Sequence, residues 1–209
     1  NTGGTPATSL AGTGLAAPFS FKGGSYPGTG GTCSTSLNNG ANCTVVVTYS
    51  PTVSGAHNDT IQIDYDDGGG VVSTTRDITG TGAPAALLSI SNGPLFDFSS
   101  KAVGSSTDQA LTVNNIGGVP ATSIAGTGLA SPFSFKGGSY PGAGGTCGGT
   151  LANGSNCTLI VTFAPVATGS FSDTLDLNYH DGAAATSTSR DLQGTGSAPA
   201  VLELAGVPY

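Results

Sequence analysis

The chain has 209 residues, of which 37% are hydrophobic and only 8% are charged, and its formal net charge is −7. Five Lys and Arg residues cannot form the clustered basic surface that phosphate groups require, so nucleic acid is excluded as a partner. No apolar run approaches the ~20 residues of a membrane-spanning helix, so we expect no membrane insertion in this segment.

The sequence repeats itself with a period of 114 residues, which is the size of one ordinary domain. Gly14–Cys33 returns as Gly128–Cys147 with two of twenty positions changed. We therefore expect residues 1–84 to form a domain that lacks its first strands and residues 85–199 to form a complete one. Residues 200–209 are expected to be the first strand of a following repeat or a strand donated to another chain.

Strands are expected in both copies of the repeat. Residues 43–49 alternate apolar and polar side chains, and residues 157–163 repeat the alternation, which is typical of a half-buried strand. Residues 59–65 and 173–179 form the next expected strand. Asp-Gly follows it in both copies and suits a hairpin turn, from which a further strand returns.

The complete repeat contains further apolar segments before these strands, at residues 87–91, 95–98, 109–115 and 132–135. No stretch shows a sustained apolar period of 3.6 residues, and glycine is too frequent for long helices. About seven short strands in 114 residues predict an all-β fold, with each repeat forming a two-sheet β-sandwich.

The four cysteines form two pairs with nine residues inside each pair. A metal site would require closer spacing or accompanying histidines, and the two histidines lie elsewhere. We therefore interpret Cys33 with Cys43, and Cys147 with Cys157, as one local disulfide in each repeat. In the chain-entropy model, closing such a loop stabilises the folded state by about 2.8 kcal/mol. Because disulfides persist in oxidising compartments, we expect the protein to lie outside the reducing cytosol.

The block from Cys147 through "TLIVTFAPVATG" to the closing "DLQGTG" resembles a known family. It is similar to the immunoglobulin-like repeats of bacterial surface proteins called choice-of-anchor D, and to the ASPM–SPD-2–Hydin class of β-sandwich. The resemblance covers essentially the whole chain. It implies tandem immunoglobulin-like β-sandwich domains and an extracellular or cell-surface location, and it implies no reaction.

No catalytic constellation repeats between the two copies. His57 aligns with Phe171 and His180 aligns with Asp66, so neither imidazole belongs to a shared site. We expect a non-enzymatic protein with no cofactor.

Three carboxylates, Asp64, Asp66 and Asp67, are the weak candidates for a metal site. They can offer oxygens to Ca²⁺, although the second copy keeps only one of the three carboxylates. The alternative interpretation is the tip of a hairpin, and we expect no metal.

The near-identical loop is expected to be an assembly or contact surface, because its large side chains recur unchanged. The candidate contact residues are Phe19, Lys22, Tyr26, Phe133, Lys136 and Tyr140. The surface would meet a neighbouring repeat or an identical subunit. An adhesive module that binds a surface glycan or protein through Tyr26 and Tyr140 remains an alternative.

The C-terminal segment is the candidate donated strand, through Val201, Leu202 and Leu204. Two interpretations remain open. The chain is either a fragment of a longer array or a subunit that donates this strand to the open edge of the next subunit, head to tail. Either way, we expect a structural stalk, adhesin or fibre of a bacterial surface.

Overall fold

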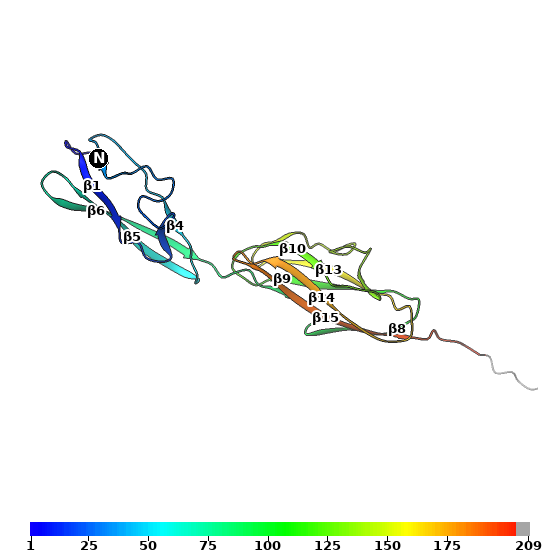
Figure 1. Cartoon of the computed structure of the whole chain (residues 1–209). Coiled ribbons are helices and arrows are strands. Elements are labelled where there is room, and N and C mark those ends of the chain that lie inside the picture. Colours follow the sequence, from blue (N-terminus) through cyan, green and yellow to red (C-terminus); the bar gives the residue numbers. More distant parts are fainter. Residues whose placement is uncertain (204–209) are drawn as a thin grey trace, which may run out of the picture. The chain divides into compact units, whose positions relative to one another are not determined.

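The computed structural model describes residues 1–203, and strands are the only regular elements in that part of the chain (Figure 1). The prediction of an all-β fold is confirmed. The chain divides into two compact units, of which the first is Asn1–Ala83 and the second begins at Pro84. Within the described residues no helix is long and apolar enough to cross a membrane.

The second unit is a sandwich of two sheets. Its strands are β7 (Leu88–Ile90), β8 (Leu95–Ala102), β9 (Thr107–Asn115), β10 (Ala121–Thr127), β11 (Phe133–Phe135), β12 (Thr150–Leu151), β13 (Asn156–Phe163), β14 (Gly169–His180) and β15 (Ala185–Ser197). One sheet has the order β12-β10-β14-β15-β8, and the other has the order β11-β13-β9-β7. Every pairing is antiparallel except that of β15 with β8, which is parallel.

The core of this unit lies between the inward faces of the two sheets. Along β13 every second side chain is buried, as the alternation of the sequence predicts. Phe163 at its end contacts Phe133 of β11 with ring centroids 4.9 Å apart and Phe98 of β8 at 5.5 Å. These aromatic contacts join the two sheets, because β8 belongs to one sheet and both β11 and β13 belong to the other.

The long hairpin of β14 and β15 closes at the Asp-Gly turn that the sequence predicts. Gly182 has a φ of 100°, a left-handed value that suits glycine. The Asp181 carboxylate accepts hydrogen bonds from the backbone N–H groups of Ala183 and Ala184. These bonds lower the pKa of Asp181, because they favour its charged form.

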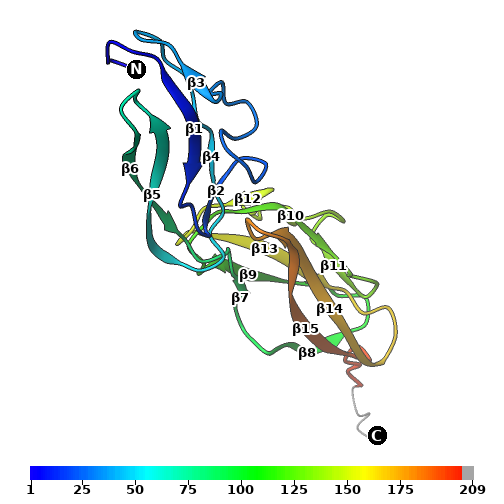
Figure 2. The same ribbon diagram turned by 60° about the vertical axis from the view of Figure 1, so that its left-hand side comes forward.

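The first unit has fewer strands. They are β1 (Ala7–Thr13), β2 (Phe19–Phe21), β3 (Ser36–Leu37), β4 (Val47–Tyr49), β5 (Gly55–Asp66) and β6 (Val71–Gly82). One sheet has the order β3-β1-β5-β6, and the other contains only β2 and β4 (Figure 2). Each of these strands corresponds to one of β10 to β15 at the 114-residue offset.

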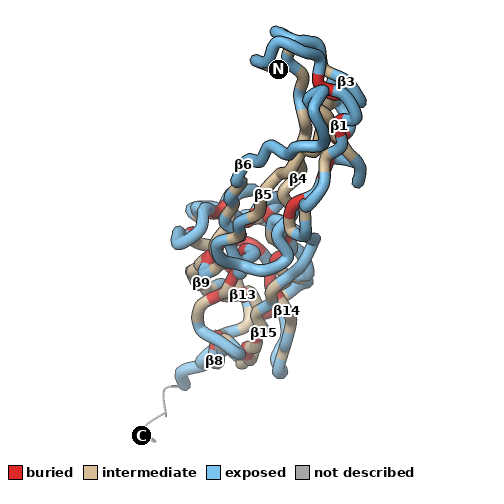
Figure 3. Tube along the Cα trace, turned by 90° about the vertical axis from the view of Figure 1, so that its left-hand side faces the viewer, coloured by how far each residue is buried: buried red, intermediate tan, exposed pale blue. Residues whose placement is uncertain are grey.

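Three strands of the second unit, β7, β8 and β9, have no counterpart among the described residues of the first unit. The consequence is seen in burial. Val161 of β13 is fully buried, whereas Val47 at the same position of β4 is only partly buried. Figure 3 shows β4 and β5 largely in the colour of intermediate burial. The inward face of the first unit is therefore open on one flank.

Candidate functional site

Both cysteine pairs form disulfides that close the same loop in each unit. Cys33 is bonded to Cys43 and Cys147 is bonded to Cys157, with Cα atoms 4.8 Å apart in both cases. In the second unit Cys157 lies within β13, so the bond ties the end of the repeated loop to a core strand. The loop has the same covalent anchor in both copies.

The repeated loop is held in place by contacts within its own unit, and these contacts explain several of its unchanged positions. Gly28 has a φ of 89°, and a Cβ at this position would collide with the backbone carbonyl of Val46. Gly142 has a φ of 91° and faces Ile160 in the same way. Glycine is required at both positions by conformation and by space.

Phe19 and Phe133 are core residues, and their prediction as contact residues is wrong. Their exposed fractions are 4% and 1%, because the Phe-Ser-Phe strands β2 and β11 point both phenylalanines inward. In the second unit Phe133 belongs to the aromatic cluster described above. These two side chains recur because the sandwich needs their volume.

Tyr26 and Tyr140 are partly buried and pack against their own unit. Tyr140 lies edge-on to Phe135 with centroids 5.8 Å apart, and Tyr26 packs against its own unit in the same way. The Tyr140 hydroxyl donates a hydrogen bond to the carbonyl of Gly148, whereas the buried Tyr26 hydroxyl has no hydrogen-bond partner among the described residues. Burial raises the pKa of both phenols. Their recurrence has an explanation within each unit.

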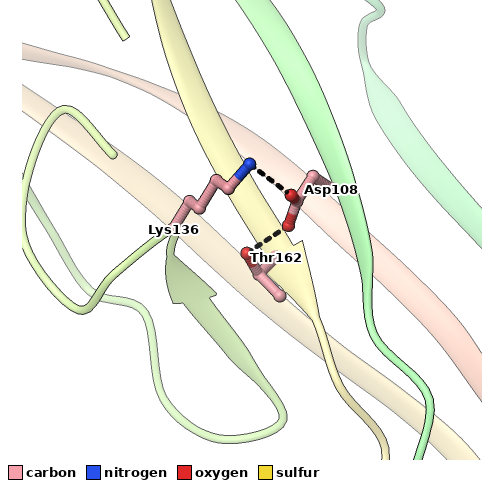
Figure 4. A network of polar contacts seen from close by, with 3 residues as sticks. All are labelled: Asp108, Lys136 and Thr162. Carbon is pink, nitrogen blue, oxygen red and sulfur yellow. Dashed lines mark hydrogen bonds and ion pairs between the residues drawn. The ribbon is translucent and has the colours of Figure 1, made fainter. Parts of the chain in front are cut away.

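Lys136 is bound within the second unit. Its Nζ lies 2.9 Å from Oδ2 of Asp108 on β9, and the Thr162 hydroxyl of β13 donates to Oδ1 of the same carboxylate at 2.6 Å (Figure 4). The hydrogen bond from Thr162 lowers the pKa of Asp108, and the hydrogen bond and the positive charge of Lys136 lower it further. The pair is partly exposed, at 48% and 38%, so it contributes little to stability and mainly fixes the position of the loop against β9.

Lys22 occupies the position of Lys136 in the first unit and is exposed. Thr48 corresponds to Thr162, so two of the three groups in Figure 4 are repeated. Within the described part of the first unit no strand brings a carboxylate to the place that Asp108 takes.

The open flank of the first unit forms a groove of about 580 Å³. Its walls include the apolar and aromatic side chains of β1, the disulfide region and β5. These side chains include Leu10, Tyr26, Cys43, Val45, Ile63 and Tyr65. In the second unit the residues at five of these six positions are buried in the core. The groove is thus the uncovered half of a sandwich core.

The carboxylates that were candidates for Ca²⁺ are not brought together. The Asp64 carboxylate accepts hydrogen bonds from the Ser73 hydroxyl and the Gln62 amide, which lower its pKa. Asp66 and Asp67 each accept a backbone N–H of the turn that follows them. Among residues 1–203 no group of three His, Cys, Asp or Glu side chains is placed to hold a metal ion.

The two histidines make local contacts. His57 Nδ1 lies 2.8 Å from the Tyr49 hydroxyl, and His180 Nδ1 accepts the backbone N–H of Gly182. Neither contact brings an imidazole to a serine or cysteine nucleophile.

Of the candidate donated strand, Val201 and Leu202 are exposed and lie in no strand. Leu204 lies outside the described residues. The donated strand stays a prediction.

Comparison with known proteins shows which family the chain resembles. A family model described as the HYDIN/CFA65/VesB-like Ig-like domain matches residues 89–195. No curated protein matches the chain. The ASH/PapD-like domain 7 of human CEP192 is similar at 20% identity and a TM-score of 0.43, over 58% of this chain and 92% of that one.

Two bacterial structures are similar at lower identity. The VesB protease of Vibrio cholerae matches at 16% identity and a TM-score of 0.41, over 52% of this chain and 31% of that one. A protein of unknown function from Porphyromonas gingivalis W83 matches at 12% identity and a TM-score of 0.41, over 93% and 87%. Because the family model spans more than half of the 209 residues, this chain belongs to the HYDIN/CFA65/VesB-like Ig-like domain family.

Proposed function

We propose that the chain is a non-enzymatic structural segment of an extracellular bacterial surface protein, in which tandem immunoglobulin-like domains of the choice-of-anchor D kind form a stalk. One observation carries this proposal. Each unit has its own disulfide in the same place, and such bonds persist in oxidising compartments. A protein built from repeated, separately cross-linked sandwiches suits a role as a spacer.

The proposal is tested on intact cells of the source organism. We expect an added protease to cleave the protein before lysis, and an alkylating reagent to label its four cysteines only after reduction. Protection from protease until lysis, together with cysteines that react without reduction, would place the protein in a reducing compartment and refute the proposal. A cytosolic protein of known abundance serves as the control for cell integrity.

A filament subunit is the second candidate function, and the open flank of the first unit favours it. An uncovered sheet edge is a template for pairing with another chain. In this version the C-terminal segment of one subunit enters the open flank of the next, and repetition gives a filament. Electron micrographs of the purified chain test it, since filaments should disappear when residues 200–209 are removed. Filaments that persist without this segment, or a monomer at all concentrations, would refute strand donation by the tail.

A further inference from the structure

The chain crosses from one sheet of the second unit to the other between β7 and β8. Before the crossing, Ser91 is tied to β9, because its backbone N–H donates to the carbonyl of Thr112 at 2.8 Å and its hydroxyl accepts the N–H of the same residue at 2.9 Å. After the crossing, β8 begins at Leu95, which pairs with Asp191 of β15. Residues 92–94 therefore join the two sheets between two fixed ends.

The first two residues of this crossover are an Asn-Gly pair. Asn92 has a φ of 62°, a left-handed value that asparagine adopts more readily than most residues. Asn92 and Gly93 are both exposed. Within residues 1–203, neither the side-chain amide of Asn92 nor the backbone N–H of Gly93 makes a hydrogen bond. Both groups are thus available for reaction with each other and with water.

An Asn-Gly pair can modify itself without an enzyme. The backbone nitrogen of the glycine loses its proton to the solvent and bonds to the side-chain carbonyl carbon of the asparagine, and the side-chain nitrogen leaves as ammonia. Water then opens the resulting succinimide ring at one of its two C–N bonds, which gives either aspartate or isoaspartate. Glycine favours the first step, because it has no Cβ to obstruct the attack.

A cation packs against Gly93. The Arg190 guanidinium of β15 donates from Nε to the carbonyl of Ser91 at 3.0 Å and from a terminal nitrogen to the carbonyl of Ile90. These bonds hold it so close to the crossover that a Cβ at Gly93 would collide with it. A positive charge at this place favours the deprotonated, anionic form of the Gly93 nitrogen, which is the form that attacks.

Other Asn-Gly pairs of the chain have different surroundings. Asn153 and Gly154 are exposed, but the Gly154 N–H donates to the carbonyl of Asn115 at 2.9 Å, and this bond must break before the nitrogen can attack. A Cβ at Gly154 would meet open space, so no described side chain packs against this glycine. The pair at residues 39–40 makes the same kind of bond, to the carbonyl of Asn1 at 2.8 Å.

We propose that Asn92 is a site of spontaneous deamidation, at which the Gly93 nitrogen attacks the Asn92 amide with the assistance of the Arg190 guanidinium. The product is aspartate or isoaspartate at residue 92. Isoaspartate adds one carbon to the backbone of a short crossover whose two ends are held by other strands, so it weakens the pairing of β7 or β8. The second unit then loses stability with age. The inference does not depend on the proposed function.

The test follows two Asn-Gly pairs in the same molecules. The 209-residue chain is incubated in mildly alkaline buffer, reduced and digested with trypsin, and mass spectrometry measures the deamidated fraction at each asparagine against an unincubated sample. We expect Asn92 to react more than about fivefold faster than Asn153, which is the factor for breaking one hydrogen bond of ordinary net strength. In the reduced chain unfolded in denaturant the two rates should become similar. Equal rates in the folded chain, or a difference that persists in denaturant, would overturn the proposal.

Two variants separate the cause of the reaction from its consequence. Arg190→Gln keeps an amide donor but removes the charge, so it should slow deamidation of Asn92 about threefold and leave Asn153 unchanged. Asn92→Gly removes the reacting amide and suits the left-handed φ, so incubation should lower the melting temperature of the unchanged chain but not of this variant. The proposal fails if Asn92 reacts as fast or faster in Arg190→Gln, or if incubation costs the unchanged chain no more stability than Asn92→Gly.

Discussion

The same substitution at the two copies of one position should lower the free energy of unfolding by very different amounts. Val161 is fully buried in β13 and Val47 is partly buried in β4. Val161→Ala removes two buried methyl groups, which is worth about 1.6 kcal/mol in transfer free energy, and the residual cavity raises the cost to about 2 kcal/mol. For a domain of about 114 residues this lowers the melting temperature of the second unit by about 8 °C. Val47→Ala should cost less than about 1 kcal/mol, since its methyl groups are already partly in water.

Thermal unfolding of the two variants, followed by calorimetry, provides the measurement, with the transition of each unit assigned by the variant that shifts it. The unchanged unit in each variant is the internal control. Equal shifts for Val47→Ala and Val161→Ala would refute the reasoning, because the first unit would then have a covered core in solution. A negligible shift for Val161→Ala would mean that β13 is not packed as described.

Three further substitutions test single contacts, each by denaturant unfolding. Gly126→Ala should destabilise the second unit by about 2 kcal/mol, because the new Cβ collides with the rings of Phe135 and Tyr140. Gly148→Ala is the control and should not change stability, because its Cβ meets open space. Equal losses of stability for the two variants would contradict this packing. Arg190→Ala should lower the free energy of unfolding by about 2 kcal/mol, because the guanidinium donates to the backbone carbonyls of Ile90 and Ser91 at the end of β7. The exposed Arg76 of the first unit is the control, and Arg76→Ala should change the free energy of unfolding little. A large loss of stability for Arg76→Ala would show that this side chain has a partner in solution. The folded pKa of Asp108 is lowered, so its small stabilisation is present above about pH 4 and is lost as the pH falls through the folded value. Asp108→Asn should therefore make the acid limb of stability against pH only slightly less steep, as expected for an exposed ion pair, and a steeper limb would contradict this.

In the second unit the sequence predicts strands that alternate without interruption and misses one that does not. In the first unit residues 43–49 also alternate, but only Val47–Tyr49 form a strand, so the prediction for residues 43–46 is wrong. The alternation in residues 157–163 corresponds to β13 and that in residues 173–179 lies within β14. β10 was not predicted, because its buried residues Ala121 and Ile124 are three positions apart. A bulge at Ser123, which has a φ of 53°, breaks the period of two and shifts the register against β14.

Phe19 and Phe133, two of the six candidate contact residues, are buried for a reason that the sequence shows only weakly. Phe133 lies in a strand of three residues, too short for its burial to be read from periodicity, although the Phe-Ser-Phe alternation was a usable signal. The partner of Lys136 is Asp108, which is 28 positions earlier in the chain and reaches it only through the pairing of β9 with β13. Such a contact depends on strand order, which a single sequence does not give.

The parallel pairing of β8 with β15 has a mechanical consequence. The pair runs from Leu95 with Asp191 to Ala102 with Ser197. When the chain is held before β8 and pulled after β15, the two parallel strands slide past each other along their length. Hydrogen bonds between the strands then bear the force together, rather than opening one after another as they would in a hairpin pulled from its open end. The second unit is therefore connected to the rest of the chain in the geometry that resists extension by shear.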